Sequence, residues 1–413
     1  MATKNRNESQ FDLYREWQWV KHVTIAKYAT PWSEILGSIA SRIYVVDGCA
    51  GAGGYLNPNT GETERDGSPI IFAKRAREYT SKRGPGKTMH VICVEPNRRN
   101  FDLLAKRLEP FANHSTTFHG TLRQHAPTIA DRIGAAPALV LLDPIGLKAI
   151  NPDSWMPLLE RQGKTDLFVV LMFPGLHRIG GMLLPDGTAD PTKPKAVAAA
   201  LEMDRVFRTD EWRAIAIDPA LKSDRHRVAR EEMYVELWLH RVIGDRHPLK
   251  AVKPVRAQSS APVKYWLAMT SAHRKAHGLV NDIMVDLEEI EILREYGTER
   301  HVEGFGRTML DAHRAEIVAN IEAATLEALA GTGNEGMPWG ALEQILETQF
   351  FARAKQNVIW KVVKGMCRGD DGRLRRQKNP GAAADPLEVI RLTSPSDTNP
   401  SPNANISPIR RAA

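Results

Sequence analysis

The chain alternates between short, uniformly apolar runs and longer segments in which apolar residues recur at helical spacing. Four runs are rich in Val, Ile, Leu and Phe, and they lie at 43–47, 89–95, 138–143 and 167–173. Uniformly apolar runs of this length are typical of strands buried on both faces of a parallel sheet. Segments with helical spacing lie between or beside them, at 69–80, 97–108, 122–133 and 153–159. This alternation predicts a doubly wound, Rossmann-like α/β sheet.

The pattern on either side of these runs extends the prediction. Residues 11–37 have helical periodicity, and Pro31 is expected to divide them into two helices. A Gly/Pro-rich stretch at 174–194 predicts a long loop, followed by helices at 196–217 and 225–243. Two strand-like runs, 248–257 and 263–270, predict a hairpin that closes the sheet. The sheet is therefore expected to be mostly parallel with an antiparallel edge.

The remaining chain differs in character. Residues 272–296 and 308–330 have helical spacing, and 337–378 is expected to form a small compact unit. The last stretch is rich in Pro, Ser, Asn and Ala, a composition that predicts disorder. The expected organisation is N-terminal helices packing on the core at 1–40, a Rossmann-like domain at 41–296 with an insertion at 55–88, a helical or winged-helix-like unit at 297–378, and a tail at 379–413.

Composition narrows the class of protein. Hydrophobic residues make up 42% of the 413 residues and charged residues 25%, which is ordinary globular composition. The longest apolar runs fall well short of the roughly 18 residues needed to cross a bilayer. The three cysteines are widely spaced and predict neither a disulfide framework nor a metal site. We therefore expect a soluble cytoplasmic protein with no membrane contact and no metal. The net charge of +7 permits contact with nucleic acid without requiring it.

The glycine-rich turn after the first run carries the clearest chemistry. Asp47 ends the run, and glycines at 51 and 53 allow the backbone to approach a ligand closely because no Cβ intervenes. A nicotinamide fingerprint needs a third glycine where Leu56 stands. The pattern D-x-x-A-G-x-G resembles instead the first motif of class I S-adenosylmethionine (SAM) methyltransferases. A plain tight turn between a strand and a helix remains the alternative.

That resemblance implies roles for individual residues. It places the methionine portion of SAM against five residues of the turn: Asp47, Gly48, Ala50, Gly51 and Gly53. Glu95 ends the second run, where a carboxylate in the family accepts both ribose hydroxyls. A solvated charge at the end of a strand is the alternative for Glu95. The insertion at 55–88 is expected to lie over the cofactor or substrate, either as a lid or as a decorative loop.

The third run ends in Asp143-Pro144-Ile145-Gly146. This is where SAM-dependent amino-methyltransferases carry D/N-P-P-Y/F, and the second proline and the aromatic residue are missing here. The resemblance implies that Asp143 and Pro144 lie beside the reacting group, with Asp143 as a candidate general base. A turn after a buried strand is the alternative. Arg178, after the fourth run, is a candidate for holding a phosphate or carboxylate, or else a surface pairing partner.

Several motifs occur in the order found in the three-Cys-motif partner protein family, which the chain resembles over about 15–370. They are Y-V-V-D-G-C-A-G-A-G at 44–53, D-G-S-P at 66–69, C-V-E-P-N at 93–97, L-D-P-I-G-L-K at 142–148, F-P-G-L-H-R at 173–178 and Y-W-L-A-M-T-S-A-H at 265–273. The resemblance implies a methyltransferase-type Rossmann domain with a C-terminal helical or winged-helix-like part. It also implies a protein partner that resembles radical-SAM proteins and carries the three cysteines.

The compact unit at 337–378 interleaves cations with aromatic residues, including Lys361, Lys364 and Arg373 around Trp360. This arrangement fits a winged-helix reader of DNA or RNA. A solvated helix face, with Trp360 and Val363 packed inward, is an equal alternative.

Two hypotheses follow for the whole chain. The first is a SAM-dependent methyltransferase that acts on or with nucleic acid, together with a partner protein. The second is a catalytically degenerate methyltransferase fold that serves as a partner or adaptor protein. The acids Asp47 and Glu95 favour the first hypothesis, and the D-P-I-G departure favours the second.

Overall fold

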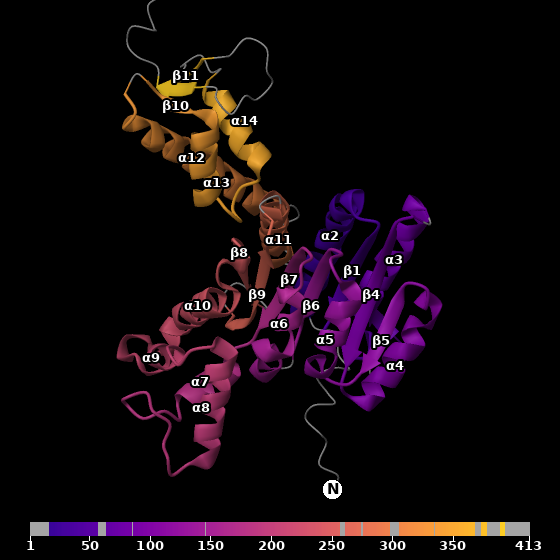
Figure 1. The fold of residues 1–413 in the computed structure, drawn as a ribbon. Coiled ribbons are helices and arrows are strands. Elements are labelled where there is room, and N and C mark those ends of the chain that lie inside the picture. Colours follow the sequence, from indigo (N-terminus) through magenta and orange to yellow (C-terminus); the bar gives the residue numbers. More distant parts are fainter. Residues whose placement is uncertain are drawn as a thin grey trace, which may run out of the picture. The chain divides into compact units, whose positions relative to one another are not determined.

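The chain was analysed as a computed structural model, which divides into two compact units, residues 1–283 and 284–413 (Figure 1). The structure describes residues 16–56, 63–84, 86–144, 146–256, 261–273, 276–297, 305–333, 335–367, 373–377 and 389–392. The division falls within helix α11 (Ala276–Gly297), so the expected boundary at 297 lies further along the chain. No helix in the described ranges is long and apolar enough to cross a membrane.

The first unit is built on a seven-stranded sheet of order β5-β4-β1-β6-β7-β9-β8. Its strands are β1 (Arg42–Asp47), β4 (Thr88–Glu95), β5 (Ser115–His119), β6 (Ala138–Leu142), β7 (Thr165–Leu171), β8 (Leu249–Arg256) and β9 (Val263–Ser271). The first five are parallel, whereas β9 is antiparallel to both β7 and β8. The predicted fold class, mostly parallel with an antiparallel edge, is confirmed. The strand order reverses between β1 and β6, which makes this the switch point of the sheet.

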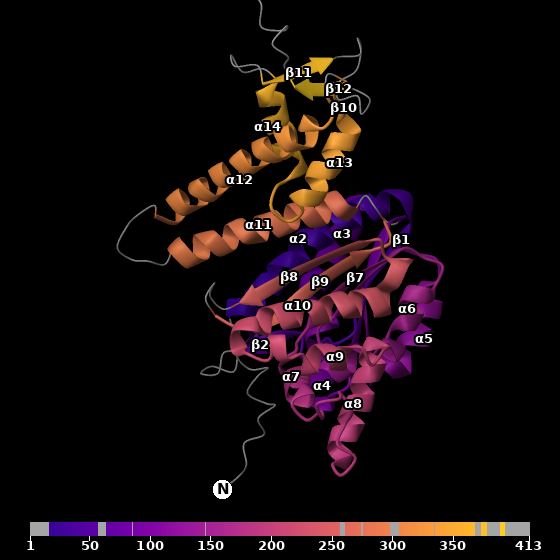
Figure 2. The ribbon, with the colours of Figure 1, turned by 90° about the vertical axis from the view of Figure 1, so that its left-hand side faces the viewer.

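Helices alternate with the strands and cover both faces of the sheet (Figures 1 and 2). They are α2 (Glu16–Ile39), α3 (Ser68–Arg83), α4 (Arg98–Leu108), α5 (Leu122–Ile133), α6 (Met156–Glu160), α7 (Pro174–Gly180), α8 (Pro194–Phe207), α9 (Trp212–Ile217) and α10 (Arg227–Trp238). One apolar core joins Tyr44 and Val46 of β1 to α5, α6, α8 and α10. Because side chains alternate along a strand, Ile43, Val45 and Asp47 point to the other face, where α2 and α3 contact β1.

Helix α2 corrects one prediction, because it runs through Pro31 without a break. A proline inside a helix removes one backbone hydrogen bond and costs about 3 kcal/mol. Packing offsets that cost here, since Tyr28, Ala29 and Trp32 are almost fully buried. The Tyr28 hydroxyl also donates to Asp166 Oδ2 at 2.7 Å, which fixes the helix against the start of β7.

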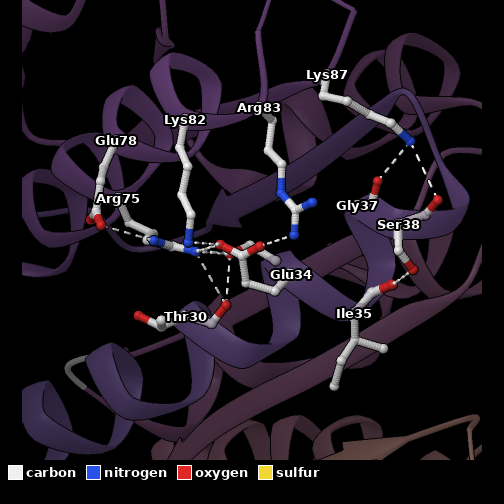
Figure 3. A network of polar contacts seen from close by, with 11 residues as sticks. Thr30, Glu34, Ile35, Gly37, Ser38, Arg75, Glu78, Lys82, Arg83 and Lys87 are labelled. Carbon is white, nitrogen blue, oxygen red and sulfur yellow. Dashed lines mark hydrogen bonds and ion pairs between the residues drawn. The ribbon is translucent and has the colours of Figure 1, made fainter.

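A polar network fastens the C-terminal half of α2 to α3 (Figure 3). Glu34 accepts hydrogen bonds from Arg75, at 2.8 Å, and from Arg83. The Arg75 guanidinium, 7% exposed, also donates to Ser33 Oγ from both Nε and Nη2. Lys87 donates to the carbonyl oxygen of Gly37 at 2.7 Å. Every polar group named here has a partner, so the network holds the two helices together.

The expected insertion at 55–88 is largely a part of the core. Strands β2 (Gly54–Leu56) and β3 (Thr63–Asp66) form a short hairpin, whose tip at 57–62 lies outside the described residues. Helix α3 follows and crosses from the hairpin to β4. Its Phe72, Ala73, Ala76 and Tyr79 side chains are no more than 1% exposed. Whether the hairpin acts as a lid stays a prediction.

The segment after β7 differs in detail from the sequence prediction. The single helix expected at 196–217 is two helices, α8 and α9, because Arg208 adopts a left-handed conformation with φ of 55°. Helix α10 continues into a five-residue π-helix, Leu239–Ile243. The predicted hairpin is present as β8 and β9.

The second unit contains α12 (Phe305–Ala330), β10 (Met337–Pro338), α13 (Trp339–Gln349), α14 (Gln356–Met366), β11 (Leu374–Gln377) and β12 (Val389–Leu392). The three strands form a sheet of order β10-β12-β11. Strand β12 lies in the stretch predicted to be a disordered tail. That prediction is wrong for Val389–Leu392, because Ile390 is fully buried and the strand pairs with both neighbours. The rest of the tail lies outside the described residues, and the winged-helix assignment stays a prediction.

Candidate functional site

Three acids predicted from the sequence meet at the carboxyl edge of the sheet. Asp47 ends β1, Glu95 ends the neighbouring β4, and Asp143 follows β6 on the other side of β1. The three carboxylates are close enough to influence the Cys49 thiol together. Open α/β sheets bind ligands outside the carboxyl ends of their strands at the switch point. These acids therefore surround the place where this fold is expected to bind a ligand.

The turn after β1 is anchored to the strands on both sides. The Gly48 N–H donates to the Leu141 carbonyl oxygen at 2.9 Å, and the Ala50 N–H donates to the Val94 carbonyl oxygen at 3.0 Å. A Cβ on Gly48 would lie 2.7 Å from a methyl carbon of Leu122. A side chain at position 48 would therefore require the Leu122 side chain to shift, because the turn packs directly on its buried neighbours.

Gly51 and Gly53 have positive φ angles of 60° and 78°, which favour glycine. A Cβ on Gly51 would meet nothing within 4 Å, so one side of this backbone faces open space. The other side is held by Arg107 of α4, whose Nη1 donates to the carbonyl oxygens of Ala52 at 2.5 Å and Gly54 at 3.1 Å. Sequence reasoning missed Arg107, because no local pattern links it to a turn more than 50 residues earlier.

Glu95 joins the turn to β4. Its Oε2 accepts from the Gly51 N–H at 2.8 Å and its Oε1 accepts from the Asn97 N–H at 2.7 Å. The side chain is 6% exposed, and burial raises the pKa of its carboxyl although both backbone bonds lower it. The Asn100 side chain is a third donor that lowers this pKa. A carboxylate can accept about four hydrogen bonds, so Glu95 retains the capacity for about one more.

Asp47 is fully buried and only partly satisfied. Its Oδ1 accepts from the Cys49 N–H at 3.3 Å, whereas Oδ2 has no hydrogen-bond partner among the described residues. Burial raises the pKa of this carboxyl to about 7; the negative charge of Asp143 adds to the rise, and the Ser68 hydroxyl opposes it. A buried carboxylate oxygen without a donor is costly, and such groups are commonly completed by a ligand or a water molecule.

Sequence reasoning missed a buried lysine that forms an ion pair with the third acid, Asp143. Lys21 of α2 forms an ion pair with Asp143, and the side chains are 6% and 24% exposed. Burial alone would lower the pKa of Lys21, but Asp143, Tyr55 and Tyr265 outweigh it and raise the pKa above its usual value. The spacing did contain a signal. Lys21 lies four and seven residues before Ile25 and Tyr28, on the helix face that becomes buried.

The neighbour of Lys21 is neutral. His22 is buried, and burial together with the Lys21 charge lowers its pKa to about 3. Its ring lies 5.5 Å from the ring of Tyr55, measured between centroids. The cationic group at this edge is therefore Lys21.

Of the other predicted site residues, Pro144 is buried beside Asp143, and Ile145 lies outside the described residues. Arg178 is on α7 with an exposed side chain, and the described part of the chain gives it no hydrogen-bond or ion-pair partner. The preceding His177 points inward instead. Its Nε2 lies 2.8 Å from Oε1 of Glu231, a buried carboxylate that also accepts from Trp266 Nε1 at 3.0 Å.

The basic cluster predicted in the second unit is partly neutralised. Lys355 pairs with Asp286 at 2.5 Å, and Arg373 pairs with Glu322 at 2.9 Å. Trp360 packs at 4.5 Å from Trp339 between ring centroids. Lys361 is exposed, whereas Arg368, another cation of this unit, lies outside the described residues. These contacts agree with the inward packing of the aromatic residues and do not test nucleic-acid binding.

Comparisons with known proteins give methyltransferases at low similarity. No protein-family model matches the sequence, and no curated protein is similar to it at a significant level. Similar solved structures include the O-methyltransferase from Bacillus cereus in complex with SAH, at 12% identity and a TM-score of 0.28, covering 64% of this chain and 96% of that one. A provisionally assigned RNA methyltransferase from Pyrococcus horikoshii is 10% identical, with a TM-score of 0.26 and coverage of 60% and 79%.

The human methyltransferase 10 domain containing protein is also 10% identical, with a TM-score of 0.27 and coverage of 61% and 82%. At identities and TM-scores this low, what the chain binds has to be inferred from its own strand order and site. The resemblance to three-Cys-motif partner proteins stays a prediction.

Proposed function

We propose that the carboxyl edge of the first unit binds SAM and that the protein is a SAM-dependent methyltransferase. The observation that carries the proposal is the unsatisfied Oδ2 of buried Asp47, next to the open backbone of Gly51 and one strand away from Glu95. A plain structural turn would need neither a buried acid near pKa 7 nor an open side at Gly51. The residues present therefore fit the cofactor.

Each residue would hold a different portion of the cofactor. Glu95 would accept one ribose hydroxyl on its remaining lone pair and the other in place of the Asn100 side chain. Asp47 Oδ2 and the backbone at Gly51 and Gly53 would hold the methionine portion. The bound group supplies an activated methyl on a sulfonium. The protein's part is to align the acceptor with it and to exclude water.

For the acceptor we propose nucleic acid, presented together with a partner protein. Support comes from the net charge of +7 and from the exposed Lys361 on α14 of the second unit. Asp143 and Pro144 would lie beside the reacting group. The Lys21 ammonium already occupies Asp143, so an amine acceptor would have to replace it there.

That ion pair is also the observation that favours the second function. If Lys21 stays on Asp143, the acceptor side of the site is filled by the chain itself, as expected of a degenerate methyltransferase fold that serves as an adaptor. In that case SAM binding could persist without transfer.

Calorimetric titration with SAM and with S-adenosylhomocysteine tests the cofactor proposal. We expect binding in the micromolar range, about −8 kcal/mol, and Glu95→Ala should weaken it by at least about 1 kcal/mol. Glu160→Gln, which removes an exposed carboxylate at 54% exposure, is the matched control and should bind like the wild type. Absence of binding at millimolar concentration, or equal loss in both variants, would contradict the proposal.

A methyl-transfer assay distinguishes the methyltransferase hypothesis from the adaptor hypothesis. The protein would be incubated with SAM labelled on its methyl group and with DNA, RNA and protein substrates. Label in RNA or DNA supports the nucleic-acid methyltransferase. SAM binding without transfer to any substrate, with and without a partner extract, supports the adaptor.

A further inference from the structure

A second concave surface lies at the amino ends of β1, β4 and β5, the edge of the sheet away from Asp47 and Glu95. It has a volume of about 450 Å³. The side chains that matter for its chemistry are Arg42, Thr80, His90, Asn113, His114 and Arg132. They come from β1, from β4, from the residues just before β5, and from the helices α3 and α5. The hollow is therefore formed by the folded unit and not by a single loop.

The lining carries uncompensated positive charge. The charge comes from two arginines, and no Asp or Glu is among the lining residues. The two histidines of the lining add hydrogen-bonding groups. Arg42 and Arg132 are exposed, and no carboxylate of the described chain lies within ion-pair distance of either. Arg75 and Arg83 differ in this respect, because both form ion pairs with Glu34. Two guanidinium groups that line one hollow without a carboxylate partner favour an anionic ligand.

A series of hydrogen bonds through Thr116 orients the side chains of Arg132 and His90. Arg132 Nη2 donates to Thr116 Oγ1 at 3.1 Å, and Thr116 Oγ1 lies 2.8 Å from His90 Nε2. If the Thr116 hydroxyl donates to Nε2, the His90 proton resides on Nδ1. Burial, followed by the charges of Arg132 and His114, lowers the pKa of His90 to about 4. The pKa of His114 is lowered as well, by burial and then by Arg77. Cationic neighbours thus contribute to both shifts.

We propose that this hollow binds the phosphate group of a phosphorylated ligand, with Arg42 and Arg132 as its principal contacts. The planar fork of a guanidinium matches the oxygens of a phosphate, and hydroxyl and amide groups at Thr80 and Asn113 can add hydrogen bonds. A volume of about 450 Å³ is in the range of small-molecule sites and accommodates a nucleotide-sized ligand. This site is separate from the proposed SAM site and does not depend on it.

The test uses the full-length protein and three probes: inorganic phosphate, uridine monophosphate and a short single-stranded oligonucleotide. Calorimetry measures affinity, and the ring resonances of His90 and His114 report whether binding is local. We expect saturable binding that shifts both rings, whereas chloride at equal ionic strength should not. Arg42→Gln and Arg132→Gln should each weaken binding about tenfold.

The controls separate charge in the hollow from charge in general. Arg98→Gln removes an exposed arginine of α4 that pairs with Asp102, and it should leave the affinity unchanged. Arg42→Lys keeps the charge but loses the fork, so an intermediate loss is expected. Tighter binding of the oligonucleotide than of the mononucleotide would identify a phosphodiester backbone as the source, and the reverse would identify a free phosphorylated molecule. Absence of saturable binding, or equal loss in Arg98→Gln, would overturn the proposal.

Discussion

Two carboxylates of the first unit illustrate how the same group is fully satisfied by the fold at one place and left partly unsatisfied at another. Glu34, at the α2–α3 network, accepts from Arg83 and Arg75, and these bonds lower its pKa to about 2. Asp47, at the carboxyl edge, is fully buried with one unsatisfied oxygen, and its pKa is raised to about 7. Both have cations nearby. The difference is that Glu34 is hydrogen-bonded to its cations, whereas Lys21 is bound to Asp143 instead of Asp47.

The Glu34 charge stabilises the folded state, whereas the Asp47 charge destabilises it. Glu34 is 25% exposed, which limits its desolvation, and its partners satisfy it. Asp47 gains nothing comparable from the rest of the chain, and its burial opposes folding at neutral pH. Residues that break a local rule of this kind are expected at functional sites. Three substitutions test this distinction.

The largest effect is expected for Lys21→Met. Removing one partner of a buried pair leaves the other charge uncompensated, so the free energy of unfolding should fall by about 3 kcal/mol. Lys74→Met is the control, because Lys74 pairs with Asp66 at 2.5 Å but is 54% exposed. It should cost less than about 1 kcal/mol. Urea unfolding measures both, and Asp143→Asn added to Lys21→Met should restore most of the loss. Equal losses in the two lysine variants would refute the distinction.

The second effect concerns pH. The folded pKa of Asp47 lies above its unfolded value of about 4, so the folded state binds more protons and this group destabilises the fold as pH rises from about 4 to 7. Asp47→Asn removes that dependence. About three pKa units correspond to about 4 kcal/mol. Because relaxation and water penetration around a buried charge reduce this value, the variant should gain on the order of 2 kcal/mol relative to the wild type between pH 4 and pH 8 in urea unfolding. If the free energy of unfolding depends on pH in the same way in both proteins, burial of the Asp47 charge does not destabilise the fold.

The smallest effect, with the opposite sign, is expected for Glu34→Gln. The folded pKa of Glu34 is lowered to about 2, so its contribution is present above the unfolded value of about 4.3 and is lost as pH falls through the folded pKa. At pH 7 the variant should be about 1 kcal/mol less stable, a value reduced by solvent screening. The difference from wild type should shrink as pH is lowered toward 2. A loss that stays constant with pH would assign the effect to packing.

The fold could be predicted from the sequence because four of its five parallel strands are short and largely apolar, whereas β5, with the sequence Ser-Thr-Thr-Phe-His, has no such pattern. Each expected parallel strand is present, and the acids at their ends meet where the topology requires. The hairpin of β8 and β9 was also visible in the pattern. Periodicity records which residues are buried, and burial is what determines these elements.

Other features could not be predicted, because they depend on contacts between distant segments. Pro31 lies inside a continuous helix because tertiary packing overrides its local cost. Arg107 holds the glycine turn, and no local spacing points to that contact. Helical spacing places Lys21 on the buried face of α2, but it does not identify its partner Asp143, which lies 122 residues further on. Strand β12 was missed because four apolar-rich residues stand in a segment whose overall composition favours disorder.

The position of α2 in the chain has a consequence for synthesis. The helix leaves the ribosome before β7, and the Tyr28 hydroxyl has no partner until Asp166 has been synthesised, 138 residues further on. At about 5–20 residues per second, that wait is on the order of ten seconds. During this time Val20, Ile25 and Trp32, which end at no more than 2% exposure, have no core to enter. The nascent chain therefore presents an apolar helix face to the cell until β7 has emerged, and chaperones that bind such faces would have about that time to bind α2.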